Sequence, residues 1–130
     1  MARLVIAVQG VQHALGLELF KGTADSVRIG YDPAQGSFFI DRHTTQPLFA
    51  GQSERHDAAR VLDEPTITLE IWVDGSTIEL FADGGTVTIS DLVYADRTAN
   101  GVALFHGPEV LVLECVELHQ VRPVMHAAVG

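Results

Sequence analysis

The sequence predicts an all-β fold, an antiparallel β-sandwich of two sheets with a jelly-roll-like path. Three observations predict it. Short apolar segments alternate with polar residues at the two-residue period of strands, turn signals recur at intervals of about 8–12 residues, and glycine-containing hairpin signals interrupt the sharpest of these patterns. The chain has 130 residues, of which 47% are hydrophobic, enough for one domain with one core. We therefore expect a single β-sandwich domain over residues 1–130.

Strands are expected first in the amino-terminal third, over residues 4–8, 15–20, 26–31 and 37–42. The last two flank a turn at 32–36, where Pro33 fixes φ and Gly36 supplies a positive φ. The stretch 44–64 is polar and shows no strong periodicity. We expect it to form mainly a long loop.

The alternation is sharpest over residues 66–94, which we expect to form a three-stranded antiparallel meander. The apolar positions, predicted to face the core, are Leu69, Ile71, Val73, Ile78 and Leu80. The positions of opposite parity are Glu70, Trp72, Asp74, Thr77, Glu79 and Phe81. Asp74 with Gly75, and Asp83 with Gly84 and Gly85, mark the two turns because glycine adopts the positive φ that tight hairpins need.

Two last strands are predicted over residues 101–105 and 110–121. The second contains Cys115, the single cysteine of the chain. One cysteine cannot form an internal disulfide or a metal cluster of its own, and free cysteine is among the most buried residue types. We expect Cys115 to be a small core residue.

The charge of the chain narrows its partners. Asp and Glu number 17 against 8 Lys and Arg, which gives a net charge of −9. An acidic surface repels phosphate backbones and anionic lipids, so nucleic acid and membrane partners are not expected. The apolar runs are also far shorter than the roughly 20 residues that span a bilayer. A neutral ligand such as a sugar, or a partner protein, remains compatible.

The residue patterns predict no metal and no cofactor. The six histidines show neither of the short spacings typical of metal ligands, and Gly84 and Gly85 lie in a hairpin rather than before a helix. Ser76 and Ser90 lack the context of a nucleophilic serine. The apolar run at 4–8 is shorter than the core of a signal peptide, about 7–15 residues, and the sequence leaves the localisation open.

The segment 69–85, LEIWVDGSTIELFADGG, resembles a signature of the carboxy-terminal β-sandwich of glycoside hydrolase family 32, the invertases, levanases and inulinases. That signature reads roughly L-x-I-x-V-D-x-S-x-V-E-V-F-x-N-x-G, followed by a strand with T-S-R. Residues 29–32 and the pair Asp41 and Arg42 match its I-G-Y-D and L-D-R. The resemblance covers about residues 3–121 and implies a lectin-like (concanavalin-like) sandwich. Asp83 stands where Asn is common, and Asp91 replaces the Arg.

The resemblance implies a module that is not an enzyme by itself. In this family the two catalytic carboxylates, about 5–5.5 Å apart in retaining glycosidases, belong to an amino-terminal five-bladed propeller with motifs W-M-N-D-P-N-G, R-D-P and E-C. The first motif is missing from this chain. Residues 31–33 and 114–115 echo the other two, but both lie inside the sandwich region. We therefore expect no catalytic propeller in the chain.

Two interpretations of the module are open. An aromatic pair beside carboxylates suits a sugar, and the related carbohydrate-binding family 66 uses this sandwich to hold terminal fructose. On this interpretation the chain binds fructose or fructan, and Arg42 and Glu79 converge at one end of the sandwich. The hypothesised site comprises Asp41, Arg42, Trp72, Asp74, Glu79 and Phe81.

On the alternative interpretation the same residues are structural. Trp72 and Phe81 are covered by the loop 44–64 or by a partner domain, and Arg42 forms a bidentate pair with a carboxylate such as Glu79. The module then stabilises a glycoside hydrolase propeller or dimerises with a second copy of itself.

Overall fold

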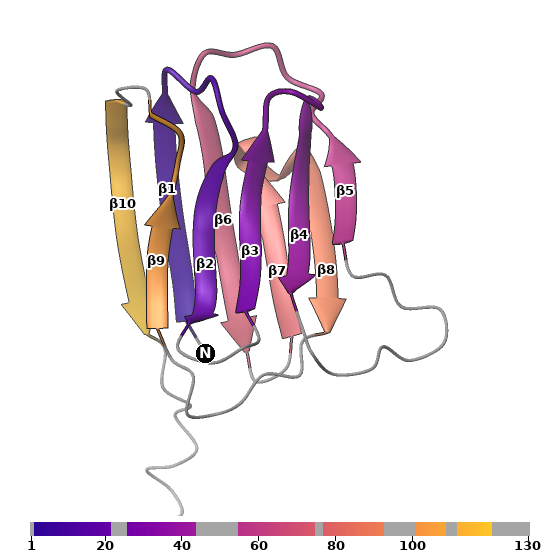
Figure 1. The fold of residues 1–130 in the computed structure, drawn as a ribbon, viewed down its shortest axis with the longest axis vertical. Coiled ribbons are helices and arrows are strands. Elements are labelled where there is room, and N and C mark those ends of the chain that lie inside the picture. Colours follow the sequence, from indigo (N-terminus) through magenta and orange to yellow (C-terminus); the bar gives the residue numbers. More distant parts are fainter. Residues whose placement is uncertain are drawn as a thin grey trace, which may run out of the picture.

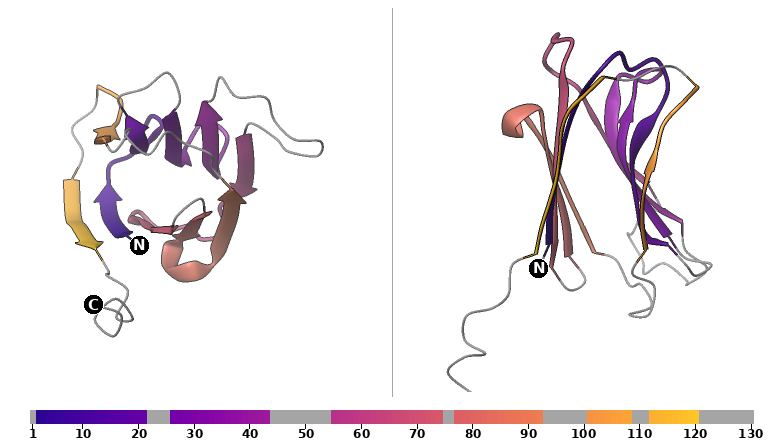
Figure 2. Two further views of the ribbon diagram at one scale, coloured as in Figure 1. Left: turned by 90° about the horizontal axis from the view of Figure 1, so that it is seen from below. Right: turned by 90° about the vertical axis from the view of Figure 1, so that its left-hand side faces the viewer.

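The computed structural model contains two five-stranded antiparallel sheets that face each other as separate layers (Figures 1 and 2). It describes residues 2–21, 26–43, 55–74, 77–92, 101–108 and 112–120, without the side chains of 20, 21, 43, 92, 101 and 112–120. Sheet A has the order β10-β1-β6-β7-β8 and sheet B the order β5-β4-β3-β2-β9. The strands are β1 (Ala2–Gln9), β2 (Leu15–Lys21), β3 (Ser26–Asp32), β4 (Ser37–His43), β5 (Arg55–Ala59), β6 (Ile67–Asp74), β7 (Thr77–Ala82), β8 (Val87–Leu92), β9 (Gly101–Phe105) and β10 (Val112–Gln120). The predicted sandwich is confirmed.

The prediction of a long loop over 44–64 is wrong at β5, which pairs with β4 at the edge of sheet B. Its sequence is polar, and the pairing of Ile40 with His56 places a histidine on the inner side. An edge strand packs less of its surface than a central one, so its hydrophobic alternation is weak. Residues 44–54 of the predicted loop lie outside the described residues.

The core lies between the sheets and follows the predicted parity of the meander. Ile71, Ile78 and Leu80 are 0% exposed, and Val73 is a partly buried residue that packs against the core. Strands β6, β7 and β8 pair in antiparallel order as predicted. The first hairpin pairs Asp74 with Thr77, while its connecting residues 75–76 lie outside the described residues.

Truncation of Ile71 or Leu80 to Ala is expected to lower the free energy of unfolding by about 2–5 kcal/mol, the usual range for large-to-small changes in a packed core. Thermal and urea denaturation would measure the loss. Thr88→Ala, at an exposed position of β8, serves as the control and should change stability by less than about 0.5 kcal/mol. Unchanged stability of both core variants would contradict the burial pattern.

Two glycines lie side by side at the centre of sheet B, where Gly16 of β2 pairs with Gly30 of β3. A Cβ on Gly30 would stand 1.9 Å from the carbonyl oxygen of Leu15, and one on Gly16 would stand 1.9 Å from that of Ile29. No side chain fits at these distances. The glycine in the motif at 29–32 is therefore required by the close approach of two backbones.

The two glycines are covered by aromatic rings from the strands on either side. Phe39 pairs with Gly30, and Phe105 pairs with Gly16. The ring centroids of Phe39 and Phe105 are 6.4 Å apart, although neighbouring strands are spaced at about 4.8 Å and two strands separate β4 from β9. The rings therefore reach toward each other across the glycine pair, on the outer face of sheet B.

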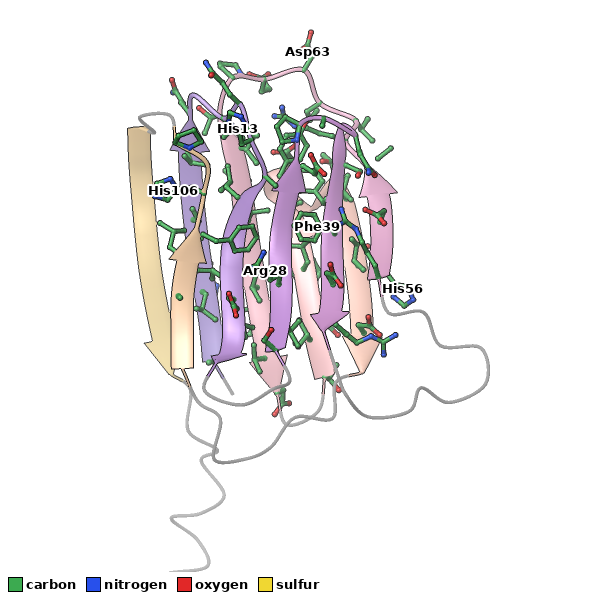
Figure 3. All side chains as sticks on the ribbon, in the orientation of Figure 1. His13, Arg28, Phe39, His56, Asp63 and His106 are labelled. Carbon is green, nitrogen blue, oxygen red and sulfur yellow. The ribbon has the colours of Figure 1, made fainter. Side chains whose placement is uncertain are left out.

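Arginines complete the cover on this outer face. The guanidinium carbon of Arg55 lies 4.3 Å from the ring centre of Phe39, and that of Arg28 lies 5.0 Å from the ring centre of Phe105. Figure 3 shows Arg28 and Phe39 over the middle of the nearer sheet. Phe39 is only 3% exposed although it points away from the core. The centre of the outer face of sheet B is thus covered by its own side chains.

A buried ion pair joins the β5–β6 connection to the turn after β7. Arg60 Nε lies 2.6 Å from Asp83 Oδ2, and a second guanidinium nitrogen donates to the carbonyl oxygens of Glu64 and Thr66. Burial lowers the pKa of Arg60, but the hydrogen bond and charge of Asp83, aided by Tyr31, raise it above its ordinary value. Asp83 begins the short 3₁₀ turn η1 (Asp83–Gly85) with φ of 51°, so the second predicted turn is confirmed.

Candidate functional site

The outer face of sheet A carries a shallow depression of about 490 Å³. It is lined by the six residues that the sequence places opposite the core: Glu70, Trp72 and Asp74 from β6, and Thr77, Glu79 and Phe81 from β7. Their predicted position on one common face is confirmed. We call this surface the β6–β7 platform. It faces away from sheet B, on the far side of the molecule in Figure 1.

Aromatic and acidic side chains alternate on the platform because of the strand register. Trp72 lies opposite Glu79, and Glu70 lies opposite Phe81. Side chains directly opposite each other in an antiparallel pair have Cβ atoms about 4.5–5.5 Å apart. Each ring on the platform therefore has a carboxylate beside it across the strand pair.

Arg3 of β1 closes one side of the platform. It pairs with Trp72 in the strand register, its Nε lies 2.5 Å from Glu70 Oε1, and its guanidinium carbon lies 5.6 Å from the Trp72 ring centre. Arg3 thus neutralises Glu70 and covers part of the indole. Sequence analysis did not single out Arg3, because the alternation within 2–9 does not reveal that β1 lies beside β6.

The structure separates Arg42 from the platform. Arg42 shares the inward parity of Phe38 and Ile40, is 4% exposed, and lies with its Nε 3.2 Å from Asp91 Oδ2 of β8. Glu79 points outward from sheet A. The convergence of Arg42 and Glu79 that the binding hypothesis required is therefore not found.

Asp41 also lies apart from the platform. It points outward from sheet B, where its Oδ2 is 3.8 Å from a guanidinium nitrogen of Arg55. Of the six hypothesised site residues, the structure brings together four, Trp72, Asp74, Glu79 and Phe81. Asp41 and Arg42 belong to the other sheet.

The partner of Arg42 is Asp91, so the structural interpretation holds for Arg42 with a different acid from the one suggested. Asp91 follows the inward parity of Val87 and Ile89, and its Oδ2 also lies 3.1 Å from His56 Nδ1. This cluster joins the two sheets where β5 lies against β8; Figure 3 shows His56 at that side. Sequence analysis did not single out Asp91 as inward-facing, although the alternation of 87, 89 and 91 is a signal that could have done so.

Of the two sequence features that echo catalytic motifs, the structure describes the side chains of one. Asp32 Oδ1 accepts a hydrogen bond from the amide of Ala34 at 3.0 Å, so it stabilises the turn after β3. Glu114 and Cys115 lie in β10, and their side chains are outside the described set. Within the described ranges, no group of three or more His, Cys, Asp or Glu is placed to hold a metal ion. No helix among the described residues could cross a membrane.

Comparison with known proteins identifies the family. The family model described as "Glycosyl hydrolases family 32 C terminal" matches residues 3–120. A levanase of Bacillus sp. (strain L7) is 27% identical over 129 residues, which cover 95% of this chain and 14% of that protein. A probable sucrose-6-phosphate hydrolase of Vibrio cholerae serotype O1 is 31% identical over 94 residues, 72% of this chain and 16% of that protein.

The solved structures agree on the fold. The exo-inulinase from Aspergillus awamori superposes with a TM-score of 0.78 at 17% identity, over 93% of this chain and 25% of that one. The chain thus spans only a small part of each of these relatives. It belongs to the glycoside hydrolase family 32 C-terminal domain family, whose two-sheet sandwich it shares.

Proposed function

We propose that the chain is a non-catalytic module of β-fructosidases that binds fructose or fructan through the β6–β7 platform. The observation that supports this is the alternation of two rings and two carboxylates over one open depression of about 490 Å³. That volume lies within the range of small-molecule sites, about 300–1,000 Å³. Because the depression is shallow and open, it suits a unit of a longer chain as well as a single sugar.

The chemistry of a fructosyl unit matches these groups. Its C–H edges pack on aromatic rings, and its hydroxyls donate charge-assisted hydrogen bonds to carboxylates. Glu79 lies across the strand pair from Trp72, so one sugar ring can contact both. A neutral ligand also tolerates the acidic surface of the chain.

Truncation of the platform is expected to weaken the binding of levan or inulin. Trp72→Ala and Glu79→Ala should each cost about 1–3 kcal/mol, roughly 5- to 150-fold in Kd, because each leaves a sugar group without its partner. Isothermal titration calorimetry with levan, inulin, sucrose and fructose measures the change. The control is Asp63→Ala, in the exposed loop at the opposite end of the sandwich from the carboxy-terminal end of β6 (Figures 1 and 3).

Two results would count against this proposal. One is a folded wild-type chain that binds none of these carbohydrates. The other is normal binding by both platform variants while they remain folded.

The same preparation is expected to release no fructose from sucrose, inulin or levan. We assign hydrolysis to the remainder of such an enzyme, because this chain lacks the propeller motif and covers 14% of the levanase it resembles. Reducing-sugar release that persists after repeated purification would contradict the non-catalytic assignment.

A second candidate function is docking. The solved relatives are far longer than this chain, which covers 25% of the exo-inulinase, and half-buried Trp72 and Phe81 suit a protein interface. The platform would then pack on a catalytic propeller or a second copy of the chain. In that case Trp72→Ala would change the association state measured by light scattering, and titrations with sugars would show no binding.

A further inference from the structure

We infer that the β6–β7 platform selects neutral fructosyl ligands and rejects those that carry a phosphate ester. The inference rests on the proposed function and concerns the ligand class of the same site. The observations that support the inference are the charges on the platform and the positions of the arginines. The names of the relatives make the distinction concrete, since they include both a levanase and a probable sucrose-6-phosphate hydrolase.

The acidic groups of the platform are only partly compensated. Glu70 is paired with Arg3. No ion pair joins Asp74 or Glu79 to another residue that the structure describes, and both line the depression. A ligand beside Thr77 and Glu79 therefore meets two carboxylates that no described residue pairs.

Among the described side chains, the cations that could bind a phosphate lie elsewhere or are already paired. Phosphate esters are recognised by forked arginine donors, lysines or the amides of a helix N-terminus. Arg3, the one arginine on this face among those with described side chains, is engaged by Glu70 and lies over Trp72. The other four are Arg28 and Arg55 on the outer face of sheet B, Arg42 between the sheets and Arg60 beside Asp83.

The backbone amides of the described platform strands are also engaged. The central strands β6 and β7 each pair with a strand on both sides, so their amides serve the sheet ladders. A phosphate monoester carries a charge of about −1.5 to −2 near neutral pH. Placed on the platform, it would be repelled by Asp74 and Glu79, and the one described cation beside it, Arg3, is already paired with Glu70.

The expected discrimination is about tenfold or more in Kd at low ionic strength. The repulsion between a multiply charged phosphate ester and a carboxylate a few ångströms away in water corresponds to about this change in Kd. The effect depends on salt, because the Debye length falls from about 30 Å at 0.01 M to about 3 Å at 1 M ionic strength. The preference should therefore shrink several-fold in high salt.

The test compares sucrose with sucrose 6-phosphate, and fructose with fructose 6-phosphate, as competitors for levan bound to the whole chain. The variant Asp74→Asn/Glu79→Gln removes both uncompensated charges, and its readout is the ratio of the two competitor constants. The matched control, Asp63→Asn/Glu64→Gln, changes the net charge equally at an exposed loop. We expect ratios of about ten or more for wild type and control, and a ratio of about three or less for the platform variant.

Three outcomes of this test would overturn the inference, and they distinguish its failure from that of the proposed function. Neutral and phosphorylated competitors of equal strength would overturn the selectivity and leave the proposed function standing. A control that lowers the ratio as much as the platform variant would show that net charge, not the platform, is responsible, and would overturn the inference as well. Failure of the wild-type chain to bind levan or any neutral sugar would overturn the proposed function itself, and the inference with it.

Discussion

Gly30→Ala is expected to lower the free energy of unfolding by about 3 kcal/mol or more, well above the usual effect of a point mutation. The added Cβ would stand 1.9 Å from the carbonyl oxygen and 2.8 Å from the carbonyl carbon of Leu15. Both are backbone atoms, so relief requires β2 and β3 to move apart at the centre of sheet B. Urea denaturation followed by circular dichroism would measure the loss.

The matched control is Gly36→Ala. Gly36 has a positive φ of 62°, but a Cβ there would meet nothing within 4 Å. Its cost should be limited to the left-handed backbone conformation, about 1–2 kcal/mol. Equal losses for Gly30→Ala and Gly36→Ala would mean that the sheet accommodates the methyl group, and that the close approach of β2 and β3 is not what requires glycine.

A motif in the sequence drew attention to Gly30, but the sequence alone did not show why glycine is required there. Gly30 stood out as part of a family motif, yet the need for glycine follows from its pairing with Gly16, a contact between strands that sequence periodicity does not report. The cover by Phe39 and Phe105 depends on two further pairings. Periodicity gives the face of a residue and leaves its neighbours on adjacent strands open.

The same limit explains which residues of the candidate site the sequence predicted and which it did not. Parity alone placed all six platform residues correctly, because β6 and β7 are a local hairpin with strong alternation. Arg3 was missed because β1 and β6 are distant in the chain and adjacent in sheet A. For Arg42, sequence analysis left both a ligand contact and a structural ion pair open, and the structure shows the ion pair, with Asp91 instead of Glu79. The parity of Arg42 with Phe38 and Ile40 indicates the interior, but periodicity does not report which acid of the facing sheet lies opposite.

Arg42→Ala is expected to cost about 3–5 kcal/mol of folding stability, the range for removing one partner of a buried ion pair. The side chains of Arg42 and Asp91 are 5% and 6% exposed, with Nε and Oδ2 3.2 Å apart. Loss of the guanidinium leaves the Asp91 carboxylate buried between the sheets with His56 as its ionisable neighbour. Chemical denaturation should show the loss, while fructan titration of the fraction that remains folded should be unchanged.

A double-mutant cycle separates this structural role from a binding role. Arg42→Met/Asp91→Leu removes both charges and is expected to be more stable than either single variant, because replacing a buried pair by apolar groups avoids an uncompensated charge. Glu18→Ala provides a contrast, since it breaks an ion pair whose Arg28 side chain is 53% exposed, and such pairs contribute at most about 1 kcal/mol. Additive losses in the cycle would contradict the buried pair as the cause. Intact stability of Arg42→Ala with weakened fructan binding would contradict it more directly, because the guanidinium would then have to contact the ligand rather than hold β4 against β8.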